Sequence, residues 1–124
     1  MEMIKRITFT ILTALFVTIF IGINQAFAVN AEENYKWYCS QCHGLTGKGD
    51  GINATKDQPV NPRNHTDTKE MAKLSASDVE NVIRDGGAAT SKSTMMPPFG
   101  KTMTDAEIKE LVAYLSKLCN CKFK

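Results

Sequence analysis

Hydrophobic residues recur at helical spacing in three segments of the chain, which are separated by long stretches without a period. The first segment covers residues 31–42, the second begins near Leu74, and the third begins after Thr104. The residues that share one helical face are Ala31, Tyr35, Tyr38 and Cys42 in the first segment, Val79, Val82 and Ile83 in the second, and Ile108, Leu111, Val112, Leu115 and Leu118 in the third. We therefore expect three main helices, and the chain shows no strand pattern and no internal repeat.

Capping-box sequences mark the start of the second and third helices. Ser75 stands three residues before Asp78, and Thr104 stands three residues before Glu107. In a capping box the first side chain accepts a hydrogen bond from the backbone three residues later, and the acidic side chain accepts one in return. Both pairs therefore predict where a helix begins.

Two long segments separate the expected helices. Residues 44–71 are punctuated by glycines and prolines. Residues 88–102 follow Gly86-Gly87, which we expect to end the second helix after at most three turns. A structureless segment as long as the first is unusual in a compact domain unless it orders against a bound group. The pattern predicts an all-α fold of three main helices and two long loops, with the last helix running to about Cys119.

The N-terminal residues have the features of a secretory signal peptide. Two basic residues precede an apolar run over residues 7–23, and Ala26-Phe27-Ala28 places small residues at the cleavage positions. The alternative is an uncleaved anchor, but the run is shorter than the ~20 apolar residues that a spanning helix needs. We therefore expect residues 1–28 to be a signal peptide. Residues 29–124 would form one exported domain, in the periplasm or an equivalent compartment, without a stable membrane anchor.

The charge of the expected mature chain is close to balanced. Removal of 28 of the 124 residues leaves 96, with 13 of the 15 Lys and Arg and 12 of the 13 Asp and Glu. A nucleic-acid-binding domain normally carries a basic stripe, so this balance argues against a nucleic-acid partner. A chain this short also buries little apolar surface by itself. A large apolar cofactor would relieve that shortage.

The strongest chemical signal is the sequence Cys39-Ser-Gln-Cys42-His43, which has the spacing that attaches a c-type haem. Two cysteines on one helical turn can each add to a haem vinyl group, and the next residue can bring an imidazole nitrogen to the iron. A thioredoxin-like pair would need a strand and helix around it, and half a zinc site would need a second pair of ligands. We therefore expect one covalently attached haem c with its iron.

The chain from Ala31 to Leu118 resembles the class I cytochromes c, specifically the small bacterial monohaem type. The matching segments are, in order, Cys39-Ser-Gln-Cys42-His43-Gly44, Gly47-Lys-Gly49-Asp50-Gly51, Asn61-Pro62-Arg63-Asn64-His65-Thr66-Asp67, Val82-Ile83-Arg84-Asp85-Gly86-Gly87, Met96-Pro97-Pro98-Phe99-Gly100 and Val112-Ala113-Tyr114-Leu115. The resemblance implies a class I cytochrome c fold, in which the helices and the two loops wrap around one haem.

The resemblance also implies the residues that hold the cofactor. Cys39 and Cys42 match the thioether cysteines, His43 matches the proximal iron ligand, and Met96 matches the distal ligand. Pro62 matches a proline whose carbonyl accepts a hydrogen bond from the proximal imidazole, which would fix the ring and raise its basicity toward iron.

The packing of the helices is implied in the same way. Ala31, Tyr35 and Tyr114 match the positions where the first helix crosses the last, so we expect Tyr35 to contact Tyr114. Met71 and Met103 each precede an expected helix and are predicted to lie in the core.

A haem with histidine and methionine at its axial positions has no open site for a substrate. The resemblance therefore implies a carrier and not an enzyme. The protein would be a soluble exported monohaem cytochrome that passes single electrons between redox proteins through its exposed haem edge. Lys48, Lys92 and Lys101 lie in loops expected beside that edge, which gives a limited argument for an acidic partner.

Three alternatives stay open. His65 is the one other histidine besides His43, so a bis-histidine haem would have to use it. A peroxidase or a gas-binding sensor would need an open distal position with polar groups beside it, and Arg63 and Arg84 are the available candidates. The third alternative is a haem subunit that relays electrons within a larger enzyme complex.

The choice between two adjacent methionines follows from the next residue. Adjacent side chains of an extended loop point to opposite sides, so Met95 and Met96 are not expected to face the iron together. Pro97 restricts the residue before it to extended conformations, which should hold Met96 in one orientation.

Cys119 and Cys121 lie outside the resemblance. A disulfide between them would close a very short ring, because residues two apart rarely meet disulfide geometry without distortion. Bridges to another chain, a bound metal, a distal thiolate or exposed free thiols are the other interpretations.

Overall fold

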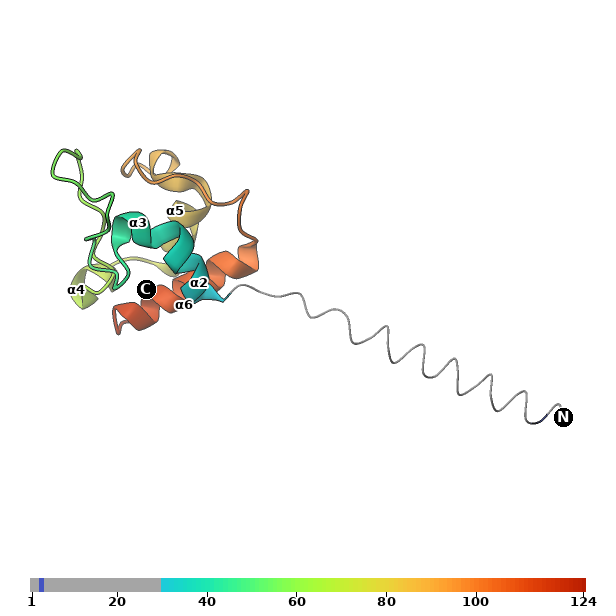
Figure 1. The fold of residues 1–124 in the computed structure, drawn as a ribbon. Coiled ribbons are helices and arrows are strands. Elements are labelled where there is room, and N and C mark those ends of the chain that lie inside the picture. Colours follow the sequence, from blue (N-terminus) through green and yellow to red (C-terminus); the bar gives the residue numbers. More distant parts are fainter. Residues whose placement is uncertain (1–2, 4–29) are drawn as a thin grey trace.

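The structure is a computed structural model that describes Met3 and residues 30–124 (Figure 1). The elements are α2 (Ala31–Asn34), η1 (Tyr35–Cys39), α3 (Ser40–His43), α4 (Thr68–Met71), α5 (Ala76–Ala89) and α6 (Asp105–Leu118). The described residues contain helices and no strand, which confirms the predicted all-α fold. The expected signal peptide, residues 1–28, lies outside the described residues except for Met3. Among the helices that are described, none has the length and apolar character needed to cross a membrane.

The first predicted helix is confirmed, but it contains a wider turn that the sequence pattern did not predict. Elements α2, η1 and α3 follow one another without a break, and η1 is a π-helical turn in which the Ser40 amide donates to the Tyr35 carbonyl. In a regular α-helix, residues five apart point in different directions, whereas the π turn brings them to the same side. Tyr35 and Ser40 are therefore both buried, and Tyr38 from the predicted face is 44 % exposed.

The second helix, α5, begins where the capping box predicted. The Ser75 hydroxyl accepts from the Asp78 amide, and the Asp78 carboxylate accepts from the Ser75 amide. The prediction that the helix ends at Gly86-Gly87 is only partly right. The chain kinks at Gly86, where φ is 80°, and then makes one more helical turn to Ala89.

Helix α4 was not predicted, because a single turn is too short to show a hydrophobic period. Its first turn is capped by the Asp67 carboxylate, which accepts from the backbone amides of Lys69 and Glu70. Met71 at its end is 1 % exposed, as expected for a core residue.

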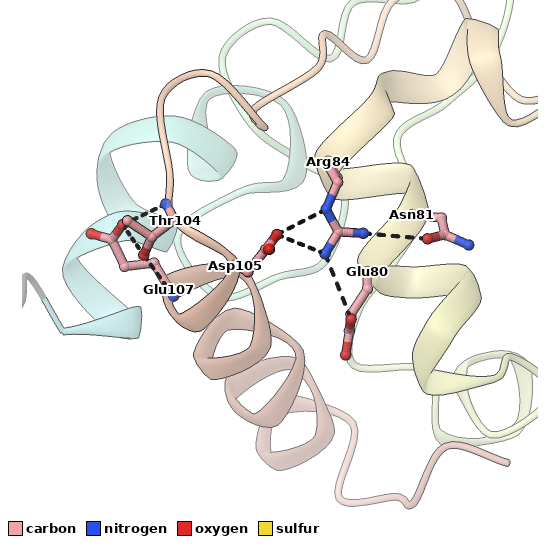
Figure 2. A network of polar contacts seen from close by, with 6 residues as sticks. All are labelled: Glu80, Asn81, Arg84, Thr104, Asp105 and Glu107. Atoms are coloured by element: carbon pink, nitrogen blue, oxygen red, sulfur yellow. Dashed lines mark hydrogen bonds and ion pairs between the residues drawn. The ribbon is translucent and has the colours of Figure 1, made fainter.

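The last helix, α6, begins at its predicted cap and ends close to its predicted end. The Thr104 hydroxyl accepts from the Glu107 amide, and the Glu107 carboxylate accepts from the backbone and hydroxyl of Thr104 (Figure 2). These hydrogen bonds hold the pKa of Glu107 below its usual range. Cys119 follows as the C-cap.

Arg84 joins α5 to the start of α6 (Figure 2). Its guanidinium donates to the Asp105 carboxylate over 3.0–3.1 Å and lies 3.8 Å from the Glu80 carboxylate. The Asp105 side chain is 78 % exposed, so this pair contributes at most about 1 kcal/mol. The pair therefore links α5 to the first residue of α6 with little contribution to stability.

The first and last helices cross as predicted, with α2 lying beside α6 (Figure 1). The Tyr35 and Tyr114 rings have centroids 5.3 Å apart, and Ala31 packs against the same core. The buried hydrophobic core comprises Tyr35, Met71, Val79, Ile83, Met103, Ile108, Leu111, Val112, Leu115 and Cys119. Met103 is thus a core residue, as its place before the capping box predicted.

The C-terminal cysteines form a disulfide with each other, so the interpretation as exposed free thiols is wrong. Cys119 is 1 % exposed and Cys121 packs against the core. Asn120 between them adopts a φ of 47°, a left-handed conformation that asparagine tolerates, and the chain thereby reverses. The tail then returns to the start of α5, where the Lys124 amide donates to the Leu74 carbonyl over 2.9 Å.

The Thr104 cap gives a direct test of this fold. Thr104→Ala should lower the free energy of unfolding by about 1 kcal/mol, because it leaves the Glu107 amide without its acceptor. Thr102→Ala is the control, since the Thr102 side chain is exposed in the adjacent loop. Denaturant unfolding of the haem-loaded protein measures both. Equal stability of the two variants would show that the capping box does not stabilise α6.

Candidate haem site

A cavity of about 730 Å³ lies between the helices and the two loops. Its volume is in the upper part of the ~300–1,000 Å³ range of ligand pockets. Each of the four predicted cofactor-binding residues, Cys39, Cys42, His43 and Met96, lines it. The apolar part of its wall is formed by Val60, Met71, Leu74, Val79, Val82, Ile83, Phe99, Leu111 and Leu115. Residues far apart in the sequence are therefore brought together around one largely apolar space.

Cys39 and Cys42 are both free thiols at the end of the first helix. Burial, and then the nearby Cys42, raise the pKa of Cys39 to about 12. The Cys39 side chain is therefore a neutral thiol at physiological pH. The pair presents two reduced sulfurs to one cavity, as two thioether bonds to a single cofactor require.

His43 is held by a hydrogen bond between its Nδ1 and the Arg63 carbonyl, 2.9 Å long. A carbonyl oxygen can only accept, so Nδ1 carries the proton and Nε2 keeps its lone pair. Burial is the main reason that the pKa of His43 is lowered, and the lowered pKa favours the neutral ring. A neutral imidazole with a fixed tautomer is the form that binds a metal.

The acceptor for His43 differs from the one implied by the resemblance, so the prediction for Pro62 is wrong. The Pro62 carbonyl oxygen lies against Gly49, where a Cβ would come within 2.5 Å of it. Gly49 has a φ of 79°, which favours glycine, and its amide donates to the His43 carbonyl over 2.8 Å. The loop therefore passes so close to the helix end that the next carbonyl, from Arg63, reaches the imidazole.

His65 lies directly against His43. The two rings are stacked with centroids 4.1 Å apart and planes 17° apart, and His65 is 8 % exposed. Rings in stacking contact have no room for a macrocycle between them, so the bis-histidine hypothesis does not fit this arrangement. Burial, followed by the nearby His43 and Arg63, lowers the pKa of His65 to about 3, and the ring is neutral.

The contacts of His65 were missed by the sequence analysis, which considered this residue only as a possible second axial histidine. Its Nδ1 lies 3.1 Å from the Tyr35 hydroxyl, and its amide donates to the Gly47 carbonyl over 2.6 Å. His65 belongs to a loop without a period, so no pattern in the sequence could show which side chains it meets.

Met96 is the methionine of the adjacent pair that packs inward. Both methionines line the cavity, but the Met96 side chain is half-buried against the core, whereas Met95 is 51 % exposed. The Met96 carbonyl accepts from the Gly87 amide over 2.9 Å. A Cβ at Gly87 would collide with the Ser93 carbonyl, so glycine is required for this loop to lie directly on α5.

Tyr38 connects the first helix to the methionine loop. Although it is partly exposed, its ring lies 6.0 Å from the Phe99 ring in an edge-to-face arrangement, and both line the cavity. The Phe99 amide donates to the Ile83 carbonyl over 3.0 Å. The two aromatic rings therefore form one part of the cavity wall, contributed by elements that are distant in sequence.

These residues fit a haem. Its flat apolar body matches the hydrophobic wall, its two vinyl groups match the two free thiols, and its iron accepts nitrogen and thioether ligands of the kind that His43 and Met96 offer. The fit rests on the side chains that can bind iron or the vinyl groups, and on the apolar lining of the cavity.

Comparison with known proteins supports the same conclusion. Residues 26–115 match the family model described as "Cytochrome C oxidase, cbb3-type, subunit III". A solved structure titled "KustC0563 c-type cytochrome" is 26 % identical, with a TM-score of 0.55, and the match covers 73 % of this chain and 98 % of that one. Among curated proteins, no sequence matches the chain. The chain belongs to the family described as cytochrome c oxidase, cbb3-type, subunit III, and it is a small class I c-type cytochrome with a covalently bound haem c.

Proposed function

We propose that the protein is an exported carrier that passes single electrons between redox proteins, with its haem iron held by His43 and Met96. The observation that carries this proposal is that an imidazole and a thioether line one largely apolar cavity. His43 offers an imidazole whose Nδ1 is occupied by the Arg63 carbonyl. Met96 offers a thioether that lines the cavity and packs against the core, whereas Met95 also lines the cavity but is more exposed. The bound haem supplies one-electron redox chemistry.

The chain's own residues have three tasks in this function. Cys39 and Cys42 hold the cofactor by thioether bonds, which prevents its loss when the iron changes oxidation state. The apolar wall excludes water and raises the reduction potential, and a thioether ligand acts in the same direction. The Arg63 carbonyl keeps His43 in one tautomer. A site with both axial positions filled and rigid supports rearranges little during electron transfer.

The contacts of the two arginine candidates do not mark an open distal site. The Arg63 backbone holds His43, so Arg63 belongs to the imidazole side of the cavity. Arg84 binds Asp105 and Glu80 and is not among the cavity-lining residues. These contacts favour a carrier over a peroxidase or a gas-binding sensor.

A second function keeps support from the family description, which names a subunit of an oxidase. In that function the haem would relay electrons inside a larger complex. A purified monomer with reversible one-electron behaviour supports the free carrier, whereas a protein that is recovered only with other subunits supports the relay.

The proposed location is the periplasm or an equivalent compartment, after cleavage that follows Ala28. The Cys119–Cys121 disulfide supports it, because disulfides persist mainly in oxidising compartments. Redox partners would dock at the haem edge. Lys48, Lys92 and Lys101 are exposed in the loops, which is compatible with an acidic partner.

Removal of both thioether cysteines should prevent covalent attachment. Cys39→Ala with Cys42→Ala is expected to leave the exported chain largely unfolded, because a cavity of about 730 Å³ in so small a domain would lose its contents. Mass spectrometry measures haem attachment and circular dichroism measures helicity. Cys119→Ala with Cys121→Ala is the matched control and should retain the haem. A stable helical chain without haem would contradict the expectation.

The two methionines can be separated by their spectra. Ferric His/Met haem shows a weak absorption band at the red end of the spectrum that reports the sulfur–iron bond. Met96→Ala should abolish this band, lower the reduction potential and let the iron bind carbon monoxide. Met95→Ala should keep the band, because that side chain is 51 % exposed and does not pack against the core as Met96 does.

Carbon monoxide also separates the carrier from the enzyme or sensor. The unmodified ferrous protein should not respond to it, since both axial positions are filled. A band that survives Met96→Ala and is lost in Met95→Ala would transfer the ligand role to Met95. A carbon monoxide complex of the unmodified protein would support an open distal site.

A further inference from the structure

We propose that His65 is a positioning residue that fixes the orientation of the His43 ring about the iron, and that Tyr35 holds His65 in place from the first helix. This inference rests on the proposed ligand role of His43. It concerns the plane of the imidazole, whereas the preceding proposal concerns only which atoms bind the iron.

The His43 ring is restrained in two different directions. The Arg63 carbonyl holds its edge through Nδ1 at 2.9 Å. The His65 ring covers its face at 4.1 Å, with planes only 17° apart. Rotation of His43 about its side-chain bond would break the first contact and drive the ring into His65. The carbonyl alone would not prevent the ring from tilting, so the stacked ring supplies the second restraint.

His65 is itself fixed on both its backbone and its side chain. Its amide donates to the Gly47 carbonyl over 2.6 Å, and its Nδ1 lies 3.1 Å from the Tyr35 hydroxyl. A Cβ at Gly47 would come within 3.3 Å of the His65 Cβ, so the turn is packed closely around it. A buried hydrogen-bonded ring of this kind has one defined orientation.

Tyr35 connects this arrangement to the crossing of the helices. It is 2 % exposed, and its ring centroid lies 5.8 Å from that of His65 and 5.3 Å from that of Tyr114. A contiguous series of packed rings therefore runs from α6 through Tyr35 and His65 to His43. The orientation of the proposed ligand thus depends on a contact in the core of the fold.

The orientation of the His43 ring would affect the electronic state of the haem iron. An axial imidazole donates π electrons only perpendicular to its own plane, so its orientation selects which iron orbital holds the unpaired electron of the ferric state. Groups that orient a ligand are known to tune metal sites in this way. The orientation is visible in the g values of electron paramagnetic resonance and in the order of the haem methyl resonances.

The test compares three variants of the haem-loaded protein. His65→Leu removes the stacked ring and the hydrogen bond, and Tyr35→Phe removes only the hydroxyl and keeps the ring packing. Tyr114→Phe is the control, because it alters the same helix crossing without touching His65. We expect His65→Leu to change the g values, reorder the haem methyl resonances and shift the potential. Tyr35→Phe should give a smaller change of the same kind, and Tyr114→Phe should match the unmodified protein.

A His65→Leu protein with unmodified g values and methyl order, even if less stable, would overturn the proposal. If that variant yields no haem protein, Tyr35→Phe decides, and an unmodified spectrum for it would overturn the proposal in the same way. The unmodified protein separates this test from the proposed function. If the unmodified protein lacks the red absorption band, methionine ligation is refuted. If the band persists in all three variants, ligation is intact, and the g values and methyl resonances then test only the role of His65.

Discussion

The packing of Tyr35 between the last helix and His65 is the contact on which both the fold and the site depend. On one side, the Tyr35 ring fills the crossing with Tyr114 that joins the first and last helices. On the other side, its hydroxyl reaches His65, which stacks on His43. The π-helical turn that begins at Tyr35 sets the direction in which the side chains of the following cysteines point. Removal of this contact would therefore loosen the helix crossing and the imidazole together.

Close approach of backbones explains how long loops can build a rigid site. Gly49 lets one loop lie against the end of the first helix, where it presents the Arg63 carbonyl to His43. Gly87 lets the other loop lie on α5, where it turns Met96 inward. Neither loop has a hydrophobic period, but each is fixed by hydrogen bonds to a helix. The apolar cofactor completes a core that so short a chain cannot fill with its own side chains.

Local signals in the sequence predicted the helices well, because capping and periodicity act between neighbouring residues. Thr104 and Glu107 show this, since the predicted capping box forms as expected. Contacts between distant segments could be predicted less well from the sequence. The π-helical turn that exposes Tyr38 leaves no mark in the spacing of hydrophobic residues. The stacking of His65 on His43 depends on where a loop folds back against the first helix. A disulfide between Cys119 and Cys121 is not expected from the sequence, because the ring that it closes is very short. The left-handed conformation of Asn120 reverses the chain between the two cysteines and makes the disulfide possible.

Near-infrared magnetic circular dichroism of the ferric protein tests the central claim most directly, because its charge-transfer band identifies the pair of axial ligands. The claim is that the cavity holds a low-spin haem iron between the His43 imidazole and the Met96 thioether. The predicted result is the single low-spin charge-transfer band of a histidine–methionine pair in the ferric protein, together with no carbon monoxide complex when the protein is reduced. A band typical of two histidines or of a histidine and a thiolate, or a high-spin spectrum, would contradict it.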